Sequence, residues 1–193
     1  MPKNMNRFPV AHGGVTNDKF VFLTACHLKK HKSVDLVIKA FNKAFCNGEN
    51  VALTIAGDGE CKQELMSLCE ALNEHRVNFI GRYTREDSPA IFASADSFVL
   101  TSQVEPFGIV YIEAMLAGLP CIGTKGQGAD DIITDSNGLL VEYGDIDMLS
   151  KAMKKVYQKC WNHLLIQKEC IQKFSDDSVC SRIEKIYEKV KRG

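Results

Sequence analysis

Short apolar segments that alternate with amphipathic ones constrain the fold of this chain more than any other feature. The apolar segments are rich in β-forming residues, and the amphipathic ones carry apolar residues at helical spacing. The six expected strands are 19–26, 51–57, 77–81, 97–102, 120–124 and 138–142. The expected helices are 33–45, 61–74, 84–95, 108–118, 145–159, 163–174 and 177–191. This order predicts an α/β fold, a doubly wound parallel sheet of about six strands with helices on both faces and at the C-terminal end.

Local signals place several helix ends. Ser33 and Thr84 are N-cap candidates, and the acidic residues after Thr84 suit the first turn of a helix. Gly118 is a C-cap candidate. The first residues are aperiodic, so we expect a lead-in over 1–18 and one domain over 19–193.

Charge and cysteine content exclude several functions. The 24 basic and 24 acidic residues cancel, and the short basic run 27–32 gives no support for a nucleic-acid partner. Eight cysteines occur without a C-x-x-C pair, which favours reduced core thiols over a metal site and predicts a reducing, cytoplasmic location. No signal-peptide pattern or apolar run of membrane-spanning length is present.

Parallel sheets bind ligands at the carboxyl ends of their strands. The rule points to the loops near 26–32, 57–60, 81–84, 102–108 and 123–130. In the second of these, "GDGE", the amides could approach a phosphate, or the segment could be a tight turn in which Asp58 helps to cap the next helix. No P-loop motif is present.

The stretch "VEPFGIVYIE" (104–113) contains two glutamates, Glu105 and Glu113, around a helix start. Gly108 permits close backbone approach, and the amides of Phe107, Gly108 and Ile109 could bind an anionic diphosphate. Glu113 could accept hydrogen bonds from a vicinal diol, and Glu105 from another polyol. Together they would suit a nucleotide-sugar, although two solvated surface glutamates fit the spacing equally well.

Seven ordered motifs resemble one family, the retaining glycosyltransferases of family 4, which have two Rossmann-like halves (the GT-B fold). "VEPFGIVYIEAMLAGLP" resembles the family's E-x7-E segment. The other matching segments are "HLKKHKSVDLVIKAF", "LTIAGDGE", "VNFIGRY", "ADSFVLTS", "SNGLLVEYGD" and "FSDDSVCSRIEKIYEKV". The resemblance implies the C-terminal, donor-binding half, a Rossmann-like domain.

The resemblance also implies roles for individual residues. Glu113 would hold the ribose hydroxyls and Glu105 the hydroxyls of the transferred sugar. The amides around Phe107, Gly108 and Ile109 would contact sugar and diphosphate. The main chain of Arg82, after Gly81, would read the nucleobase. Lys32 matches the family's phosphate-binding lysine, and Glu105, Lys32 and His27 form the expected catalytic set.

Two departures from the family pattern stand out. Where the family has Gly-Arg-Leu, this chain has Cys26, His27 and Leu28. Either His27 replaces the arginine weakly, or Lys29 or Lys30 reaches in, or the role rests on Lys32 and the helix. Near the C-terminal end, Asp176 or Asp177 stands where the family has tryptophan, with an expected effect on packing alone.

The family reaction needs no divalent metal or other cofactor. Metal-dependent glycosyltransferases carry a D-x-D motif, and Asp145-Ile-Asp147 has this pattern. Its place at the start of an amphipathic helix favours capping instead. Retention at the anomeric carbon is implied by the family alone.

The resemblance further implies an acceptor-binding N-terminal half that this chain lacks. The expected partners are a nucleotide-sugar and, through that other half, a glycan or lipid-linked acceptor of polysaccharide assembly. Peripheral contact with the inner face of the cytoplasmic membrane is compatible with this role. Two alternatives stay open: an epimerase or phosphorylase of the same fold, and a nucleotide-sugar-binding module that is inactive alone.

Overall fold

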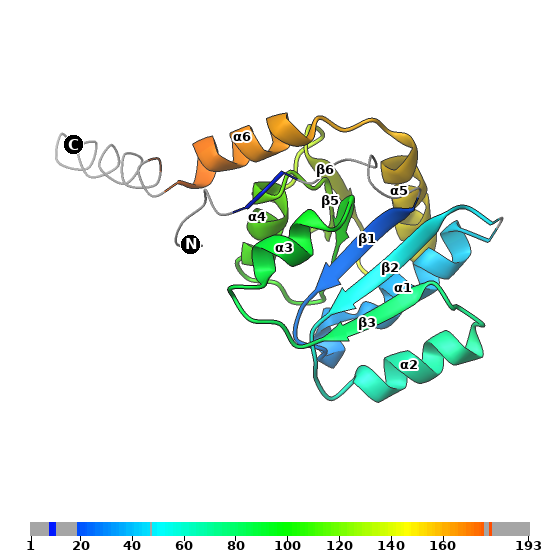
Figure 1. The fold of residues 1–193 in the computed structure, drawn as a ribbon. Coiled ribbons are helices and arrows are strands. Elements are labelled where there is room, and N and C mark those ends of the chain that lie inside the picture. Colours follow the sequence, from blue (N-terminus) through cyan, green and yellow to red (C-terminus); the bar gives the residue numbers. More distant parts are fainter. Residues whose placement is uncertain (1–7, 11–18, 47, 176–177, 179–193) are drawn as a thin grey trace.

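A single parallel sheet organises the computed structural model, which describes residues 8–10, 19–46, 48–175 and 178 (Figure 1). Its six strands are β1 (Phe20–Ala25), β2 (Val51–Ala56), β3 (Val77–Gly81), β4 (Ser97–Val99), β5 (Cys121–Thr124) and β6 (Gly138–Val141). They lie in the order β3-β2-β1-β4-β5-β6, and every neighbouring pair is parallel. The predicted sheet is confirmed. From β1, the chain first extends the sheet in one direction with β2 and β3. It then returns and extends the sheet in the opposite direction with β4, β5 and β6. The topological switch point therefore lies between β1 and β4.

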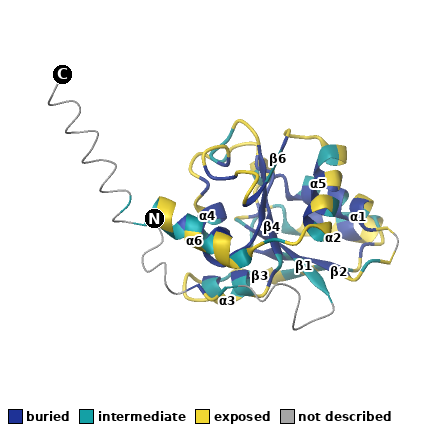
Figure 2. Ribbon diagram, turned by 90° about the horizontal axis from the view of Figure 1, so that it is seen from above, coloured by how far each residue is buried: buried dark blue, intermediate teal, exposed yellow. Residues whose placement is uncertain are grey.

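Helices cover both faces of the sheet (Figure 2). On one face lie α1 (Val34–Ala44), α2 (Lys62–Ala71) and α5 (Ile146–Gln158), and on the other α3 (Ser88–Ala93), α4 (Ile109–Leu116) and α6 (His163–Phe174). A short 3-10 turn, η2 (Lys30–Lys32), precedes α1. Apart from residue 178, the predicted helix 177–191 lies outside the residues that the structure describes, as do Asp176 and Asp177.

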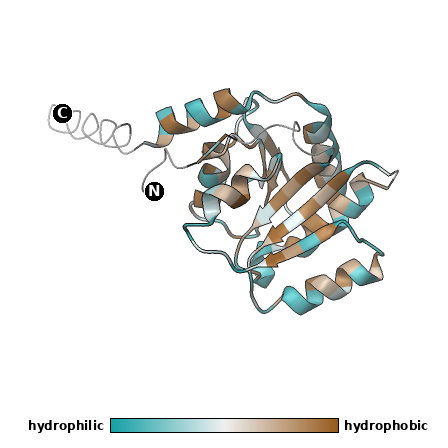
Figure 3. Ribbon diagram, in the orientation of Figure 1, coloured by the Kyte–Doolittle hydropathy of each residue, from teal (hydrophilic) through white to brown (hydrophobic). Residues whose placement is uncertain are grey.

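The core consists of two apolar layers, one on each face of the sheet. Successive strand residues point to opposite faces. Phe22 therefore packs among the α1 and α5 side chains, with its ring 6.2 Å from that of Phe41. Leu23 joins the opposite layer, which contains Phe98. Strands buried on both faces are almost wholly apolar, as Figure 3 shows.

The predicted helix over 84–95 begins later than expected. Thr84 and Asp87 exchange hydrogen bonds in a capping pattern, but the α-helix itself starts at Ser88. The reason is Pro89, which has no N–H for a bond to the Arg85 carbonyl and whose ring would clash with it. The later start places the proline in the first turn, where it is tolerated.

The other helix-end predictions have mixed outcomes. Gly118 follows α4 with φ 79°, and the Gly118 and Leu119 amides donate to the carbonyls of Met115 and Ala114. This is a Schellman C-cap, as predicted. Ser33 occupies the N-cap position of α1, but its side chain makes no capping bond. Its hydroxyl pairs with that of Tyr143 instead.

Predicted core thiols are confirmed for part of the cysteines. Cys69, Cys121 and Cys170 are buried, and every cysteine in the described part of the chain is a free thiol. Cys46 and Cys160 are exposed. Since the three buried thiols lie in apolar layers, they act as small hydrophobic side chains.

Candidate functional site

A cavity of about 320 Å³ opens at the carboxyl ends of β1 and β4, the switch point of the sheet. It is lined by Ala25, Cys26, His27, Lys32, Tyr83, Leu100, Glu105, Phe107, Ile109, Val110 and Glu113. Six of the predicted site residues are therefore brought together: His27, Lys32, Glu105, Phe107, Ile109 and Glu113. Lys29 and Lys30 do not line it. Of the cationic alternatives, the geometry favours His27 with Lys32.

A second cavity of about 320 Å³ adjoins the first. Gly57, Asp58 and Arg82 line it, and it shares three wall residues, Cys26, His27 and Tyr83, with its neighbour. Arg82 thus lies in the adjoining cavity rather than beside the two glutamates.

Lys32 and Glu105 form an ion pair inside the first cavity. Lys32 Nζ lies 2.7 Å from Glu105 Oε2, and the two side chains are 17% and 13% exposed. The other carboxylate oxygen of Glu105 accepts the Gly108 N–H at 3.3 Å. The residues lie 73 positions apart, so the pairing is a product of the topology. The ion pair thus links Lys32, the candidate for phosphate binding, to Glu105, the candidate for sugar binding.

The Glu105 backbone is fixed by the loop after β5. The Glu105 amide donates to Gln127 Oε1 at 3.0 Å, and its carbonyl accepts the Gly128 N–H at 2.7 Å. A Cβ on Gly128 would lie 2.7 Å from the Glu105 carbonyl oxygen. The loop near 123–130, predicted as part of the ligand edge, therefore acts on the site by orienting Glu105.

Glu113 lies in α4, just over one turn from its start, and is partly buried. Among the described residues it makes no hydrogen bond or ion pair, and burial raises its pKa, an effect that the Arg85 charge partly offsets. Its carboxylate is therefore available to accept hydroxyl donors. Glu105, by contrast, is held in its ion pair with Lys32. The two glutamates therefore have separate surroundings.

Two predicted glycines act through the backbone and line neither cavity. Gly108 has φ 61°, and a Cβ there would lie 2.7 Å from Ile132 Cδ1. Its small size thus serves tight packing against Ile132. Gly81 has φ 76°, and its carbonyl accepts the Gly57 N–H at 2.7 Å. Both glycines set the course of the loops that carry the site.

The "GDGE" segment is a tight turn against the loop that follows β1. A Cβ on Gly57 would lie 1.9 Å from the Cys26 carbonyl oxygen, and one on Gly59 would lie 2.5 Å from that of Leu28. The turn reading is confirmed, but the capping role of Asp58 is wrong. Its carboxylate accepts the Gly59 N–H inside the turn, and no side chain caps α2.

Tyr83 and Cys26 line both cavities, although the sequence analysis placed them only in the loops at the strand ends and gave neither a role in the site. Burial, with the Glu113 charge nearby, raises the pKa of Tyr83 to about 12. Burial also raises the pKa of the Cys26 thiol to about 12. Both groups are neutral at physiological pH. A tyrosine and a cysteine beside predicted site residues carry no pattern that would have identified them.

The D-x-D aspartates have other partners. Asp145 caps α5 by accepting the Met148 N–H at 2.8 Å, as predicted. Asp147 pairs with Lys43 of α1 at 2.5 Å. No cluster of three or more histidine, cysteine, aspartate or glutamate side chains suited to a metal occurs within the described ranges.

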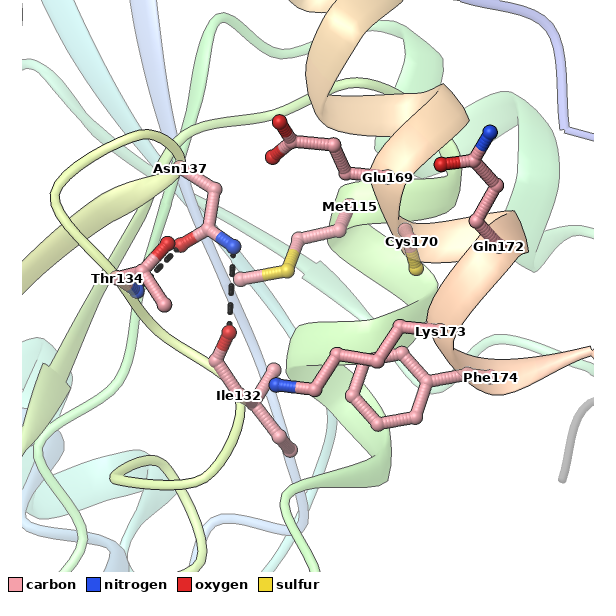
Figure 4. Close-up of a pocket in the computed structure, with 9 residues that line it drawn as sticks. All are labelled: Met115, Ile132, Thr134, Asn137, Glu169, Cys170, Gln172, Lys173 and Phe174. Atoms are coloured by element: carbon pink, nitrogen blue, oxygen red, sulfur yellow. Dashed lines mark hydrogen bonds between the residues drawn. The ribbon is translucent and has the colours of Figure 1, made fainter. Parts of the chain in front are cut away.

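Another cavity, of about 340 Å³, lies between α6 and the loop that precedes β6 (Figure 4). Its polar side chains largely satisfy one another and nearby main chain: the Asn137 amide donates to the Ile132 carbonyl, and Glu169 accepts the Ser136 hydroxyl. It shares no residue with the two cavities at the strand ends. Its lining indicates a packing crevice.

Comparison with known proteins decides the family. The family model described as glycosyl transferases group 1 matches residues 10–165, most of the chain. The chain belongs to this family. The match includes every residue of the two cavities at the strand ends, from Ala25 to Glu113.

Curated relatives of this glycosyltransferase chain are longer than it is. It is 30% identical, over 180 residues, to an uncharacterized glycosyltransferase of Methanocaldococcus jannaschii, with 90% of the chain and 46% of the relative covered. It is 31% identical, over 147 residues, to a GDP-mannose-dependent monoacylated alpha-(1-6)-phosphatidylinositol monomannoside mannosyltransferase of Corynebacterium glutamicum, with 72% and 38% covered. The chain therefore spans less than half of either relative.

Solved structures agree on the fold of this glycosyltransferase chain. A lipopolysaccharide outer core galactosyltransferase in its apo form matches with a TM-score of 0.80 and 25% identity, covering 94% of the chain and 54% of that protein. Anabaena HepE in complex with UDP and glucose matches with a TM-score of 0.80 and 23% identity, covering 96% and 55%. The predicted fold, one Rossmann-like half of the GT-B architecture, is confirmed. No helix in the described part of the chain has the length and apolarity to span a bilayer.

Proposed function

We propose that this chain is the donor-binding domain of a retaining glycosyltransferase that moves a sugar from a nucleotide-diphosphate-sugar to a glycan or lipid-linked acceptor. The observation that carries the proposal is the convergence of Lys32, Glu105 and Glu113 on one cavity at the switch point of the sheet. A diphosphate needs a cation, and a sugar and a ribose need hydroxyl acceptors. These three groups supply all of them within one site.

Each group takes the role that its surroundings favour. Lys32, with His27 beside it, binds the diphosphate, and the start of α4 at Phe107 and Ile109 faces the same cavity. Glu105 accepts the hydroxyls of the transferred sugar. Glu113, which has no partner among the described residues, accepts the ribose hydroxyls. The nucleobase extends into the adjoining cavity, where Arg82 lies.

Departure of a nucleoside diphosphate places negative charge on the β-phosphate in the transition state. A cation and aligned amide dipoles that are already in place stabilise this charge without reorganisation. Lys32 is held in position by Glu105 before any ligand binds. We infer that the reaction needs no divalent metal, since protein cations perform that role and the D-x-D carboxylates are engaged elsewhere.

Acceptor recognition belongs to a part of the protein beyond this domain. The Corynebacterium glutamicum relative is a mannosyltransferase acting on a phosphatidylinositol mannoside, and it is more than twice as long as its matched segment. By analogy, we place this protein at the cytoplasmic side of a membrane, in peripheral contact with it. The chain alone then binds donor and transfers sugar poorly or not at all.

Calorimetric titration with UDP, GDP, ADP and their sugars, with EDTA present, tests the proposal. At least one nucleotide should bind, and Glu113→Ala should abolish most of that binding. Glu70→Ala is the matched control, because Glu70 is an exposed residue near the end of α2, away from both cavities. Binding should be unaffected in the control.

Two results would overturn the proposal. One is the absence of binding by every nucleotide and nucleotide-sugar to a folded chain. The other is binding that disappears in EDTA and returns with a divalent cation, which would refute the metal-independent form.

A further inference from the structure

The imidazole of His27 is held by the main chain of the turn at Gly57–Gly59. Nδ1 of His27 lies 2.5 Å from the carbonyl oxygen of Asp58. A carbonyl oxygen can only accept a hydrogen bond, so Nδ1 carries the hydrogen. In a neutral imidazole the second nitrogen, Nε2, then has a lone pair and no hydrogen.

The Asp58 carbonyl is itself fixed. It also accepts the Leu28 N–H at 3.0 Å, and the Leu28 carbonyl accepts the Cys61 N–H at 3.1 Å. A Cβ on Gly59 would lie 2.8 Å from His27 Nδ1, so the ring packs directly against this glycine and a larger residue there would displace it. The turn therefore sets both the orientation and the tautomer of the ring.

Nε2 is the ring nitrogen left for a ligand, because His27 lines both cavities and Nδ1 is engaged. The phosphates of a nucleotide-diphosphate-sugar are ionised, and their oxygens only accept hydrogen bonds. If His27 is neutral, the lone pair of Nε2 faces the lone pairs of a phosphate oxygen, and no hydrogen bond forms. A protonated His27 offers an N–H and a positive charge at the same place.

We propose that the Gly57–Gly59 turn is a positioning element that makes His27 a donor to the diphosphate only in its protonated form. Affinity for the nucleotide-sugar is then higher at lower pH. The inference rests on the proposed function, because it needs a diphosphate in the first cavity.

Other titratable groups face His27 from each element around it: Cys26 and Lys32 from its own loop, Asp58 from the turn, Arg82 and Tyr83 after β3, and Glu105 and Glu113 around α4. With pKa values of about 12, Cys26 and Tyr83 stay neutral at neutral pH. Lys32 and Glu105 are paired with each other. Burial raises the pKa of Glu113, whose protonation at low pH would weaken ribose binding. That effect has the opposite sign to the one proposed for His27.

The test is calorimetric titration of the wild-type chain and variants with UDP-, GDP- and ADP-sugars between about pH 6 and pH 8.5. Nucleotide-sugars are suitable because they have no terminal phosphate that titrates there. From pH 8.5 to 6 the wild-type affinity should increase about tenfold or more, the lower end of the value of one charge-assisted hydrogen bond. His27→Arg keeps a permanent charge, and its affinity should remain nearly constant over this range. His27→Gln should bind weakly throughout.

Two further measurements separate positioning from folding. The ¹⁵N shifts of the His27 ring in the ligand-free chain at high pH should identify the Nδ1–H tautomer. Gly59→Ala should bind the nucleotide-sugar with a smaller change in affinity between pH 8.5 and 6 than the wild-type chain. Thermal melting of the variant checks that it is folded.

These measurements distinguish failure of the proposed function from failure of the inference about His27. If neither the wild-type chain nor His27→Arg binds any nucleotide-sugar, the proposed function fails, and the inference fails with it. If both bind with the same pH dependence, or if the ring carries its hydrogen on Nε2, the inference is overturned while the proposed function stands.

Discussion

Replacing Glu113 with glutamine should have opposite effects on stability and on ligand binding. The carboxylate is partly buried and has no hydrogen-bond or ion-pair partner among the described residues, so its charge destabilises the folded chain. Glutamine keeps the size and polarity of the side chain and removes only its charge, whose partial burial costs on the order of 1 kcal/mol. For a chain of this size, Glu113→Gln should raise the melting temperature by about 2–4 °C at pH 7.

The sign of the pH dependence follows from the raised pKa of Glu113. Between the unfolded value, about 4.3, and the higher folded value, the folded chain holds more protons than the unfolded chain. Wild-type stability therefore falls as the pH rises through that window, while the glutamine variant has no such loss. The advantage of Glu113→Gln should be absent near pH 4 and should grow as the pH rises through the raised pKa of Glu113.

Binding should change in the other direction. Against a ribose diol, the amide offers one neutral acceptor where the carboxylate offers two charged ones. Loss of one charge-assisted hydrogen bond is worth about 1.5–3 kcal/mol, a decrease in affinity of about 10- to 150-fold. Thermal melting at the two pH values and calorimetry with the best-binding nucleotide measure both effects, with Glu70→Gln as the control.

A variant that is more stable than wild type at pH 7 and still binds the nucleotide equally well would refute the ribose role. A variant that is less stable at pH 7 would refute the account of Glu113 as an uncompensated buried charge.

Three further predictions concern the rest of the site. Lys32→Ala leaves Glu105 without its counter-ion, so it should destabilise the chain by about 2–3 kcal/mol. Adding Glu105→Gln to this variant should recover part of the lost stability. Urea unfolding of the single and double variants, analysed as a double-mutant cycle, measures both effects. Gly57→Ala should lower the free energy of unfolding by about 3 kcal/mol or more, because its Cβ would lie 1.9 Å from the Cys26 carbonyl oxygen. Gly126→Ala is the control: φ is also positive there, at 73°, but no atom of the described residues beyond its chain neighbours lies within 4 Å of the added Cβ, so it should cost about 1 kcal/mol. Tyr83→Val removes a wall of both cavities and should weaken nucleotide binding about tenfold in calorimetry. Unchanged nucleotide affinity in a folded variant would contradict the placement of Tyr83 beside the nucleoside.

Much of the fold follows from the sequence because each strand is a short apolar run bounded by turn residues. The order of strands and helices predicts the parallel sheet, and the C-cap at Gly118 is visible from one glycine. The later start of α3 was also within reach, since Pro89 forbids a continuous helix from Thr84.

The site was only partly predictable, for a different reason. Lys32, Glu105 and Glu113 were identified by their place at strand ends and by the family motif. Their relations depend on contacts between distant segments: Lys32 with Glu105, Asp58 with His27, and Gln127 with Glu105. No local pattern encodes such contacts, because they arise when the topology brings separate loops to one edge.

The ion pair between Lys32 and Glu105 affects how the site responds to the many small anions of a cell. A free inorganic phosphate that approached Lys32 would have to separate a pair whose side chains are 17% and 13% exposed, and would leave Glu105 without a counter-charge. A molecule that carries a diphosphate and a hydroxylated sugar gives each member of the pair a new partner at the same moment. The pair therefore favours a compound that has both parts over a small anion that offers only one of them.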